Sequence, residues 1–180
     1  MRRLLALTLS TVCVACVDLT LPPPPAPPGP GSLQATLVYA VPGSAEKLPA
    51  ANARVRLLSS ALETTTNADG YFRLEGIAVD TGAVLIEHDV DGDGKAERSR
   101  RLDLADVKGG FGKQVSLGTV VLGRNASVTG LARGEDRADQ PSGHAATSVF
   151  VPEGPFATQT ADDGSYVLPD MPEGDLTVAF

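Results

Sequence analysis

Short runs of alternating apolar and polar residues cover most of the chain after residue 31. Alternation places every second side chain on one face of a strand and is typical of half-buried β-strands. The runs predict strands at residues 33–39, 53–58, 62–66, 71–75, 83–88, 96–104, 115–122 and 126–132. Residues 42–52 and 133–144 are polar, so we expect loops there, with a turn at 108–112. About seven short strands at this spacing predict a β-sandwich for residues 32–123.

Two ten-residue stretches, 65–74 and 159–168, repeat one pattern. Each has Thr, two residues, Asp-Gly, one residue, an aromatic, one residue and Leu, centred on Asp69-Gly70 and Asp163-Gly164. Asp-Gly is a turn dipeptide, so we expect a β-hairpin around each. A second Gly and a predicted strand (83–86 and 175–178) follow in both. The spacing predicts tandem copies of one unit, although the same hairpin pattern arising twice by chance is the alternative.

These residues resemble the carboxypeptidase regulatory-like domains, a transthyretin-like β-sandwich family related to the Cna-B-type and starch-binding-like sandwiches. The resemblance also includes the Ala-Arg-Val-Arg-Leu strand at 53–57 and a weaker counterpart at 146–150. It covers roughly residues 32 to 180. It implies an all-β fold of tandem Greek-key sandwiches, one at 32–123 and a second, incomplete one at 124–180, without the peptidase.

Residues 1–15 are predicted to be a lipoprotein signal peptide. Arg2 and Arg3 precede an apolar run at 4–15 that is too short for a membrane span of about 20 residues. The sequence 13–16, Cys-Val-Ala-Cys, resembles a bacterial lipobox, with Cys where Leu is usual in its first position. It predicts cleavage before Cys16 and lipidation of Cys16, an ordinary secretory signal being the alternative. Val17 favours the outer membrane, by resemblance to the usual sorting rule.

Residues 16–31 hold the lipidated Cys and a Pro-rich linker. Proline fixes φ and removes donors, so 21–31 should form a polyproline II stalk of roughly 30 Å. The formal charge of −7 argues against binding nucleic acid. The expected partners are therefore the membrane, through the lipid anchor, and a protein or polysaccharide ligand.

No stretch carries a complete catalytic motif. Ser44 and Lys47 match S-x-x-K, but they lie between two prolines with no helical pattern. His88 and His144 belong to no zinc-binding pattern. We expect no catalysis and no required cofactor, and a role in surface or periplasmic binding or structural display.

Two other functions stay open. One is a carbohydrate-binding module, which the absence of Trp disfavours and which exposed Tyr39, Phe111 or Phe156 in a groove would favour. The other is an accessory domain of a longer secreted enzyme, because fold analogy alone does not decide function. The first copy continues beyond its strand at 83–88, whereas the second ends at Phe180 in mid-strand. We therefore expect that the chain continues beyond Phe180 or that a partner supplies the missing strand.

Residues 89–97, Asp-Val-Asp-Gly-Asp-Gly-Lys-Ala-Glu, resemble the first half of an EF-hand-type calcium loop. The predicted ligands are the side chains of Asp89, Asp91, Asp93 and Glu97 and the backbone carbonyl of Lys95. Arg100 stands at position 12, where a bidentate Glu is usual. The alternative is a solvated acidic hairpin tip neutralised by Arg98, Arg100 and Arg101.

Overall fold

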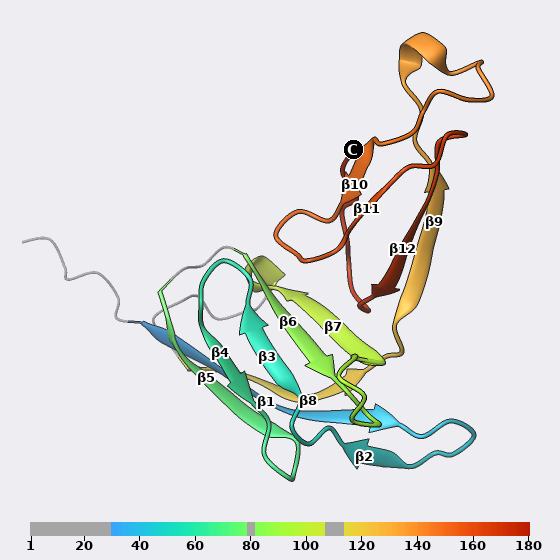
Figure 1. Cartoon of the computed structure of the whole chain (residues 1–180). Helices are drawn as coiled ribbons and strands as arrows, with labels where there is room; N and C mark the ends of the chain where they lie inside the picture. The colour runs from blue at the N-terminus through green and yellow to red at the C-terminus, as the bar shows by residue number, and fades with distance from the viewer. Residues whose placement is uncertain (1–29, 79–81, 107–113) are drawn as a thin grey trace, which may run out of the picture.

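The computed structural model describes residues 30–78, 82–106 and 114–180. The predicted signal peptide, Cys16, nearly all of the linker, the turn at 108–112 and Phe111 lie outside the described residues. Within these ranges, twelve strands and two short 3-10 turns make up the regular structure, which confirms the all-β class (Figure 1). None of the described segments forms a helix with the length and apolar character needed to cross a membrane.

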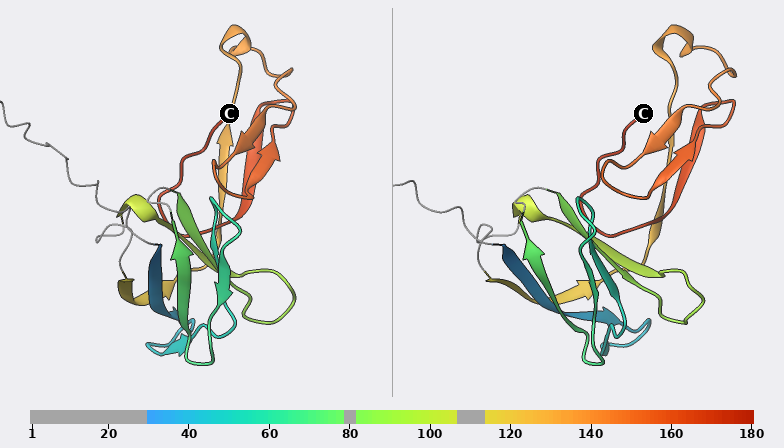
Figure 2. Two further views of the ribbon diagram at one scale, coloured as in Figure 1. Left: turned by 90° about the vertical axis from the view of Figure 1, so that its left-hand side faces the viewer. Right: turned by 60° about the vertical axis from the view of Figure 1, so that its left-hand side comes forward.

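The first region, residues 30–122, contains two sheets that lie face to face (Figure 2). In one sheet the central strand is β1 (Gly31–Ala40), with β8 (Gln114–Leu122) parallel on one side. On its other side lie β5 (Tyr71–Ile77) and the short β2 (Lys47–Pro49), which forms inside the predicted loop 42–52. The second sheet has the order β4 (Glu63–Thr65), β3 (Arg54–Leu57), β6 (Ala83–His88), β7 (Arg98–Asp103), and the 3-10 turn η1 (Leu104–Asp106) follows β7.

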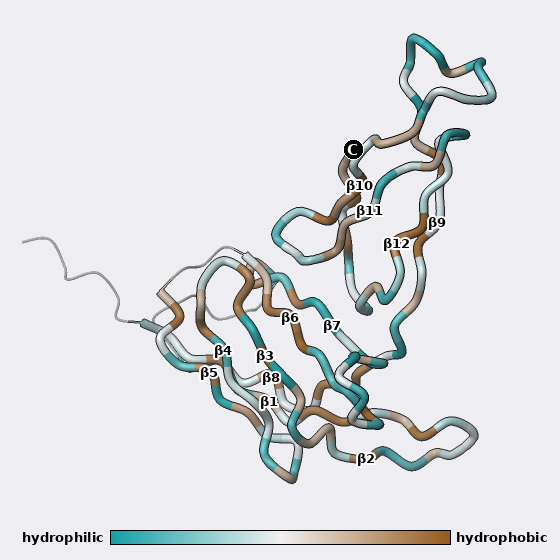
Figure 3. Tube along the Cα trace, viewed as in Figure 1, coloured by the Kyte–Doolittle hydropathy of each residue, from teal (hydrophilic) through white to brown (hydrophobic). Residues whose placement is uncertain are grey.

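The core of the first region lies between these sheets, where the apolar segments of β1, β3 and β6 gather (Figure 3). Alternation along β1 and β5 sends every second side chain inward, as the sequence pattern predicts. The β6 run 83–86 is buried at every position. Fifteen buried residues form this core: Leu33, Ala35, Leu37, Ala50, Ala53, Val55, Leu57, Phe72, Leu74, Ile77, Val84, Ile86, Leu104, Val120 and Leu122.

The second region, residues 124–180, contains two two-stranded sheets. In one, β9 (Ala126–Leu131) pairs with β12 (Ser165–Met171); in the other, β10 (Ser148–Phe150) pairs with β11 (Ala157–Gln159). The predicted loop 133–144 contains the 3-10 turn η2 (Glu135–Arg137). The strand predicted at 175–178 does not form, because the chain there pairs only through one bridge between Phe150 and Ala179.

The predicted hairpins are wrong, because each Asp-Gly turn connects two sheets. β4 pairs with β3, whereas β5, on the other side of the turn, pairs with β1. Two groups separate the strands: the Thr66 hydroxyl bonds the backbone of Ala50 and Ala53, and the Gly70 carbonyl accepts from the Leu37 N–H at 2.8 Å. The strand before the turn and the strand after it therefore pair with different strands.

The two Asp-Gly turns make matching contacts. The Thr160 hydroxyl bonds the backbone of His144 and Thr147, and the Gly164 carbonyl accepts from the Ala132 N–H at 2.9 Å. The strands that follow also pair in one register: β5 sets Leu74 opposite Leu33, and β12 sets Leu168 opposite Val128. Each ladder then shows an irregularity, after which Ile77 pairs with Gly31 and Met171 with Ala126.

Two segments of the second region are tied to β7. Asn125, between β8 and β9, donates its N–H to the Glu97 carbonyl at 2.9 Å and its side-chain amide to the Ala96 carbonyl at 2.6 Å. Its side-chain oxygen accepts from the Ser99 hydroxyl at 2.6 Å. On the open edge of β7, Glu173 exchanges backbone hydrogen bonds with Ser99 and Arg101 at 3.1 and 2.9 Å. The second region therefore covers that edge of the first sandwich.

Candidate functional site

The loop at residues 89–97 joins β6 to β7 and is shaped by its own carboxylates. The two oxygens of Asp89 accept hydrogen bonds from the backbone N–H groups of Gly92 and Gly94, at 2.6 and 2.8 Å. Asp93 accepts from the N–H of Lys95 at 2.8 Å. Both glycines have φ near the left-handed range, +81° and +90°. This conformation is open to glycine without steric cost, so the chain can coil tightly around Asp89.

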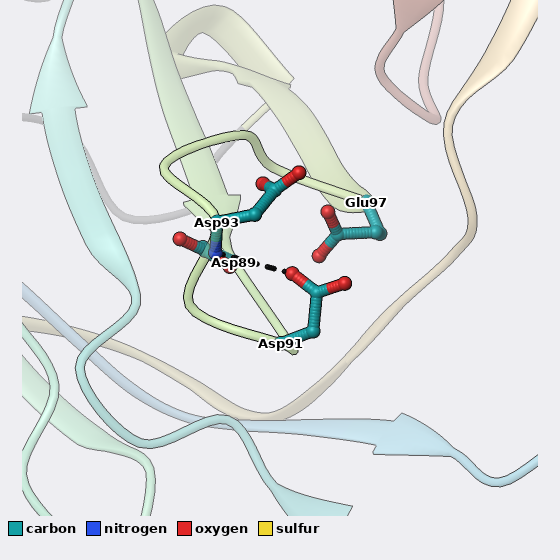
Figure 4. A group of neighbouring side chains, drawn as sticks. All are labelled: Asp89, Asp91, Asp93 and Glu97. Carbon is teal, nitrogen blue, oxygen red and sulfur yellow. Dashed lines mark hydrogen bonds between the residues drawn. The ribbon is translucent and has the colours of Figure 1, made fainter.

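The four acidic side chains of the loop converge (Figure 4). Asp89, Asp91, Asp93 and Glu97 each place one carboxylate oxygen within 4.8 Å of the others. Glu97 is turned back toward the loop, because one of its oxygens accepts from the Val90 N–H at 2.7 Å. Several hard oxygens around one point are the ligands that Ca²⁺ prefers. The donor set therefore fits this ion.

Backbone hydrogen bonds lower the pKa of Asp89 below its ordinary value. The N–H of Gly94 has the largest effect and that of Gly92 adds to it, while partial burial acts in the opposite direction. Because these N–H groups stabilise the charged form, Asp89 stays ionised to lower pH than a free aspartate. The loop thus holds its central carboxylate in the form that binds cations.

The three arginines that follow the loop do not neutralise it. Arg98 donates to the carbonyls of Ala40 and Leu122 and lies over the Tyr39 ring, 4.8 Å from the ring centre. Arg100 and Arg101 form their ion pairs with Glu173 and Asp103. Within the described residues, none of the four loop carboxylates has an ion-pair partner within 4.0 Å.

Two positions of the calcium pattern lie outside the cluster. Lys95 is exposed, and its N–H donates a hydrogen bond to Asp93. That its backbone carbonyl binds a cation stays a prediction. Arg100, at position 12 of the pattern, is part of β7 and donates to the Val121 carbonyl at 3.1 Å. The loop thus supplies carboxylates from positions 1, 3, 5 and 9 alone.

A groove of about 620 Å³ lies beside the loop, and Tyr39, Leu48, Val90, Asp91 and Arg124 are among its lining residues. Tyr39 is only half-exposed: Arg98 covers one ring face, and the His88 ring lies 5.1 Å away. Its ring is therefore occupied within the protein, which does not favour sugar stacking there.

Other residues singled out by the sequence lie apart from this loop. Phe156 packs on the core of the second region, and His144 bonds the Gln140 carbonyl at 3.0 Å. Ser44 accepts from the Glu46 N–H in an exposed turn. His88 is buried beside Tyr39, and this burial, followed by the nearby charge of Arg98, lowers its pKa. The interactions of Arg98 and Asn125 had no signal in the sequence.

Comparisons with known proteins assign no family to the chain. No protein-family model matches the chain, and no curated protein matches it. Among solved structures it is similar to the Bacillus anthracis TIE protein, with 13% sequence identity and a TM-score of 0.31 over 83% of this chain. The chain spans 30% of that protein. The described fold is β-sandwich-like.

Proposed function

We propose that this chain is a non-catalytic, exported lipoprotein built from carboxypeptidase regulatory-like sandwiches at 32–123 and 124–180. Its proposed role is binding or structural display. We also propose that residues 89–97 form a structural calcium site. The observation that supports the calcium site is the convergence of four carboxylates without a neutralising cation among the described residues. Close like charges repel one another, and a divalent cation among them removes that repulsion.

The proposed ion would act on the junction between the regions. Glu97 is the last acidic residue of the loop, and its carbonyl accepts from Asn125, the residue that leads into β9. A cation held by Asp89, Asp91, Asp93 and Glu97 would fix the side chain of Glu97 while Asn125 holds its backbone. With no bidentate Glu at position 12, affinity should fall in the range of about 10⁻⁴ to 10⁻³ M.

Thermal unfolding of the full chain with calcium and with chelator tests the site. At ten times Kd, calcium should add about 1.4 kcal/mol to the free energy of unfolding of the wild type. Asp91→Asn/Asp93→Asn should remove this gain, whereas the control Asp136→Asn/Asp139→Asn, in the polar loop of the second region, should keep it. An unfolding temperature that ignores calcium in the wild type contradicts the proposal, as does a shift that survives in the double variant.

Anchoring is tested separately, in living cells. Lipidation forms a covalent bond to the Cys16 sulfur, so metabolic labelling with a fatty acid should mark the wild type and leave Cys16→Ser unlabelled. Cys13→Leu is the matched control and should remain labelled, because Leu is the usual residue at that lipobox position and cleavage would remove it. Fractionation of the labelled protein then checks the predicted outer-membrane location. An unlabelled wild type would contradict the anchor.

A further inference from the structure

A surface groove runs past the acidic loop and reaches the second region. It consists of two adjoining hollows, of about 620 and 530 Å³, which share Tyr39, Val90 and Asp91 as lining residues. Arg124 and Asp170 of the second region also line the larger hollow. Val90 is 42% exposed, and Asp91 is exposed as well. The groove is therefore an open channel on the surface, which suits an extended chain better than a small molecule that needs enclosure.

One part of this lining is apolar. Val41, Pro42 and Leu48, from the segment that contains β2, line the larger hollow together with Val90 of the acidic loop. Pro42 is exposed and Val41 and Leu48 are half-buried, and none of the three belongs to the core of the first region. An apolar side chain laid over these residues would remove their exposed surface from water, which is favourable.

The charged part of the lining is mainly acidic. Asp91 and Glu97 come from the loop (Figure 4) and Asp170 from β12, and no described ion pair within 4.0 Å involves any of the three. Arg98 also lines the groove, but it is only 7% exposed and its guanidinium donates to two backbone carbonyls. Arg124 is the exposed base of the lining. The carboxylates outnumber it, so the groove favours a cation.

A buried histidine lines the smaller hollow. His88 is 6% exposed, and its Nδ1 has no hydrogen-bond partner among the described residues. Buried polar atoms in native proteins are nearly always hydrogen-bonded. An occupant of this hollow that brings a backbone N–H would satisfy the ring.

We infer that this groove binds an extended polypeptide segment in which basic and apolar side chains alternate. The basic side chains pair with the carboxylates of Asp91, Glu97 and Asp170, and the apolar side chains cover Leu48 and Val90. The exposed guanidinium in the lining donates to carbonyls of the segment, which an extended backbone presents at every residue.

A polysaccharide fits the groove less well, because the Tyr39 ring is covered by Arg98 on one face and has His88 beside it. The inference goes beyond the proposed calcium site and needs no bound ion. It is therefore tested in the presence of a chelator, where a failure of the calcium site does not affect it.

A short, capped and fluorescent peptide of alternating valine and lysine is a suitable probe for the full chain. Fluorescence polarisation should show saturable binding. Two matched peptides separate the contributions: glutamate in place of lysine should abolish binding, and serine in place of valine should weaken it. An oligomer of glucosamine, which carries amines without apolar side chains, should not compete. Amide shifts in NMR spectra should map the bound peptide to Tyr39, Leu48, Val90 and Asp91.

Variants of the chain test the acidic lining. Asp170→Asn and Asp91→Asn should each weaken binding by about three- to five-fold, as expected for a partly exposed ion pair. Asn tolerates the φ of +56° at residue 170, so the first variant should fold normally. Asp170 lies outside the carboxylate cluster, so this variant should keep the stabilisation by calcium. The control Asp139→Asn, exposed and outside the groove, should bind the peptide as the wild type does.

Four outcomes would overturn the inference. They are no binding of the valine–lysine peptide up to about 1 mM, equal binding of the glutamate peptide, competition by the glucosamine oligomer at the same concentration of amine, or wild-type binding by the double variant Asp91→Asn/Asp170→Asn. Amide shifts confined to residues outside the groove would also contradict it.

Discussion

The two regions share one strand register but differ in how much of it is covered. Fifteen buried apolar residues form the core of the first region, whereas Val149, Val151, Leu168 and Met171 alone form that of the second. The turn contacts and the ladder are nevertheless the same. The same register therefore accompanies the same turn contacts, those of the Thr hydroxyl and of the Gly carbonyl, in both regions, whatever the size of the core. Burial depends on strands that arrive from elsewhere.

The largest contrast should come from the matching glycines. In Gly70→Ala, a Cβ would overlap the Leu37 carbonyl oxygen at φ +76°, deep in the first core. We expect a loss of about 3–5 kcal/mol in the free energy of unfolding, from the left-handed conformation and a displaced strand. In Gly164→Ala the Cβ lies 2.7 Å from the Ala132 carbonyl, and we expect about 2 kcal/mol, because the thinner core lets β9 move.

Denaturant unfolding measures both losses, and Gly92→Ala serves as the control. Gly92 has φ +81° but nothing within 4 Å of its Cβ, so it isolates the backbone cost, about 1 kcal/mol. Equal losses for Gly70→Ala and Gly92→Ala would show that the close approach to β1 is unimportant.

The matching threonines should give a smaller contrast. Thr66→Val keeps the shape but leaves the Ala53 N–H and the Ala50 carbonyl without their partner. Unsatisfied buried groups cost about 1–3 kcal/mol each, so we expect about 3 kcal/mol in all. Thr160→Val should cost less, about 2 kcal/mol, because it leaves the buried His144 carbonyl and the Thr147 N–H, and the second of these is only partly buried. Chemical denaturation followed by hydrogen exchange assigns each loss to its region; a larger loss for Thr160→Val would reverse the comparison.

The smallest effect concerns two aspartates with lowered pKa values, one in each region. The Ser165 hydroxyl has the largest effect on Asp163, followed by the Ser165 N–H. Ser165→Ala should raise the pKa of Asp163 toward the ordinary value of about 3.9 and leave that of Asp89 unchanged. Because the folded pKa is depressed, the stability that each group contributes is present above about pH 3.9 and is lost as pH falls through the folded value. NMR titration of the two carboxyl groups measures this, and an unmoved Asp163 would exclude the hydroxyl as the cause.

The sequence predicts strands well and their partners less well. The apolar and polar pattern predicts β1, β3, β5, β6, β8 and β9 to within a few residues of their observed bounds, because a strand that buries a face needs apolar residues on that face. The hairpin prediction failed because Asp-Gly describes the turn and not what its carbonyl meets; Gly70 bonds Leu37, more than 30 residues earlier. The strand predicted at 175–178 does not form because a strand needs a neighbouring strand to pair with, and this end of the chain pairs only through the bridge between Phe150 and Ala179.

At the candidate site, too, the sequence predicts the local structure but not the long-range partners. The spacing of the acidic residues predicts a loop around shared oxygens, since local glycines allow that coil. The sequence could not show where Arg98, Arg100 and Arg101 point, because their acceptors lie far away along the chain: Ala40 for Arg98, Val121 for Arg100 and Asp175 for Arg101. Long-range partners of this kind follow from topology, which a single sequence does not contain.

The parallel pairing of β1 and β8 has a mechanical consequence. Residue 31 begins β1 and residue 122 ends β8, and the ladder runs parallel between Ser32↔Gln114 and Tyr39↔Leu122. Tension applied between the N-terminal side of the chain and the second region pulls these two strands in opposite directions along their length. Their hydrogen bonds are then loaded together in shear, whereas a hairpin pulled at its open end would lose them one at a time. The first region should therefore open under force at a rate set by its unfolding barrier.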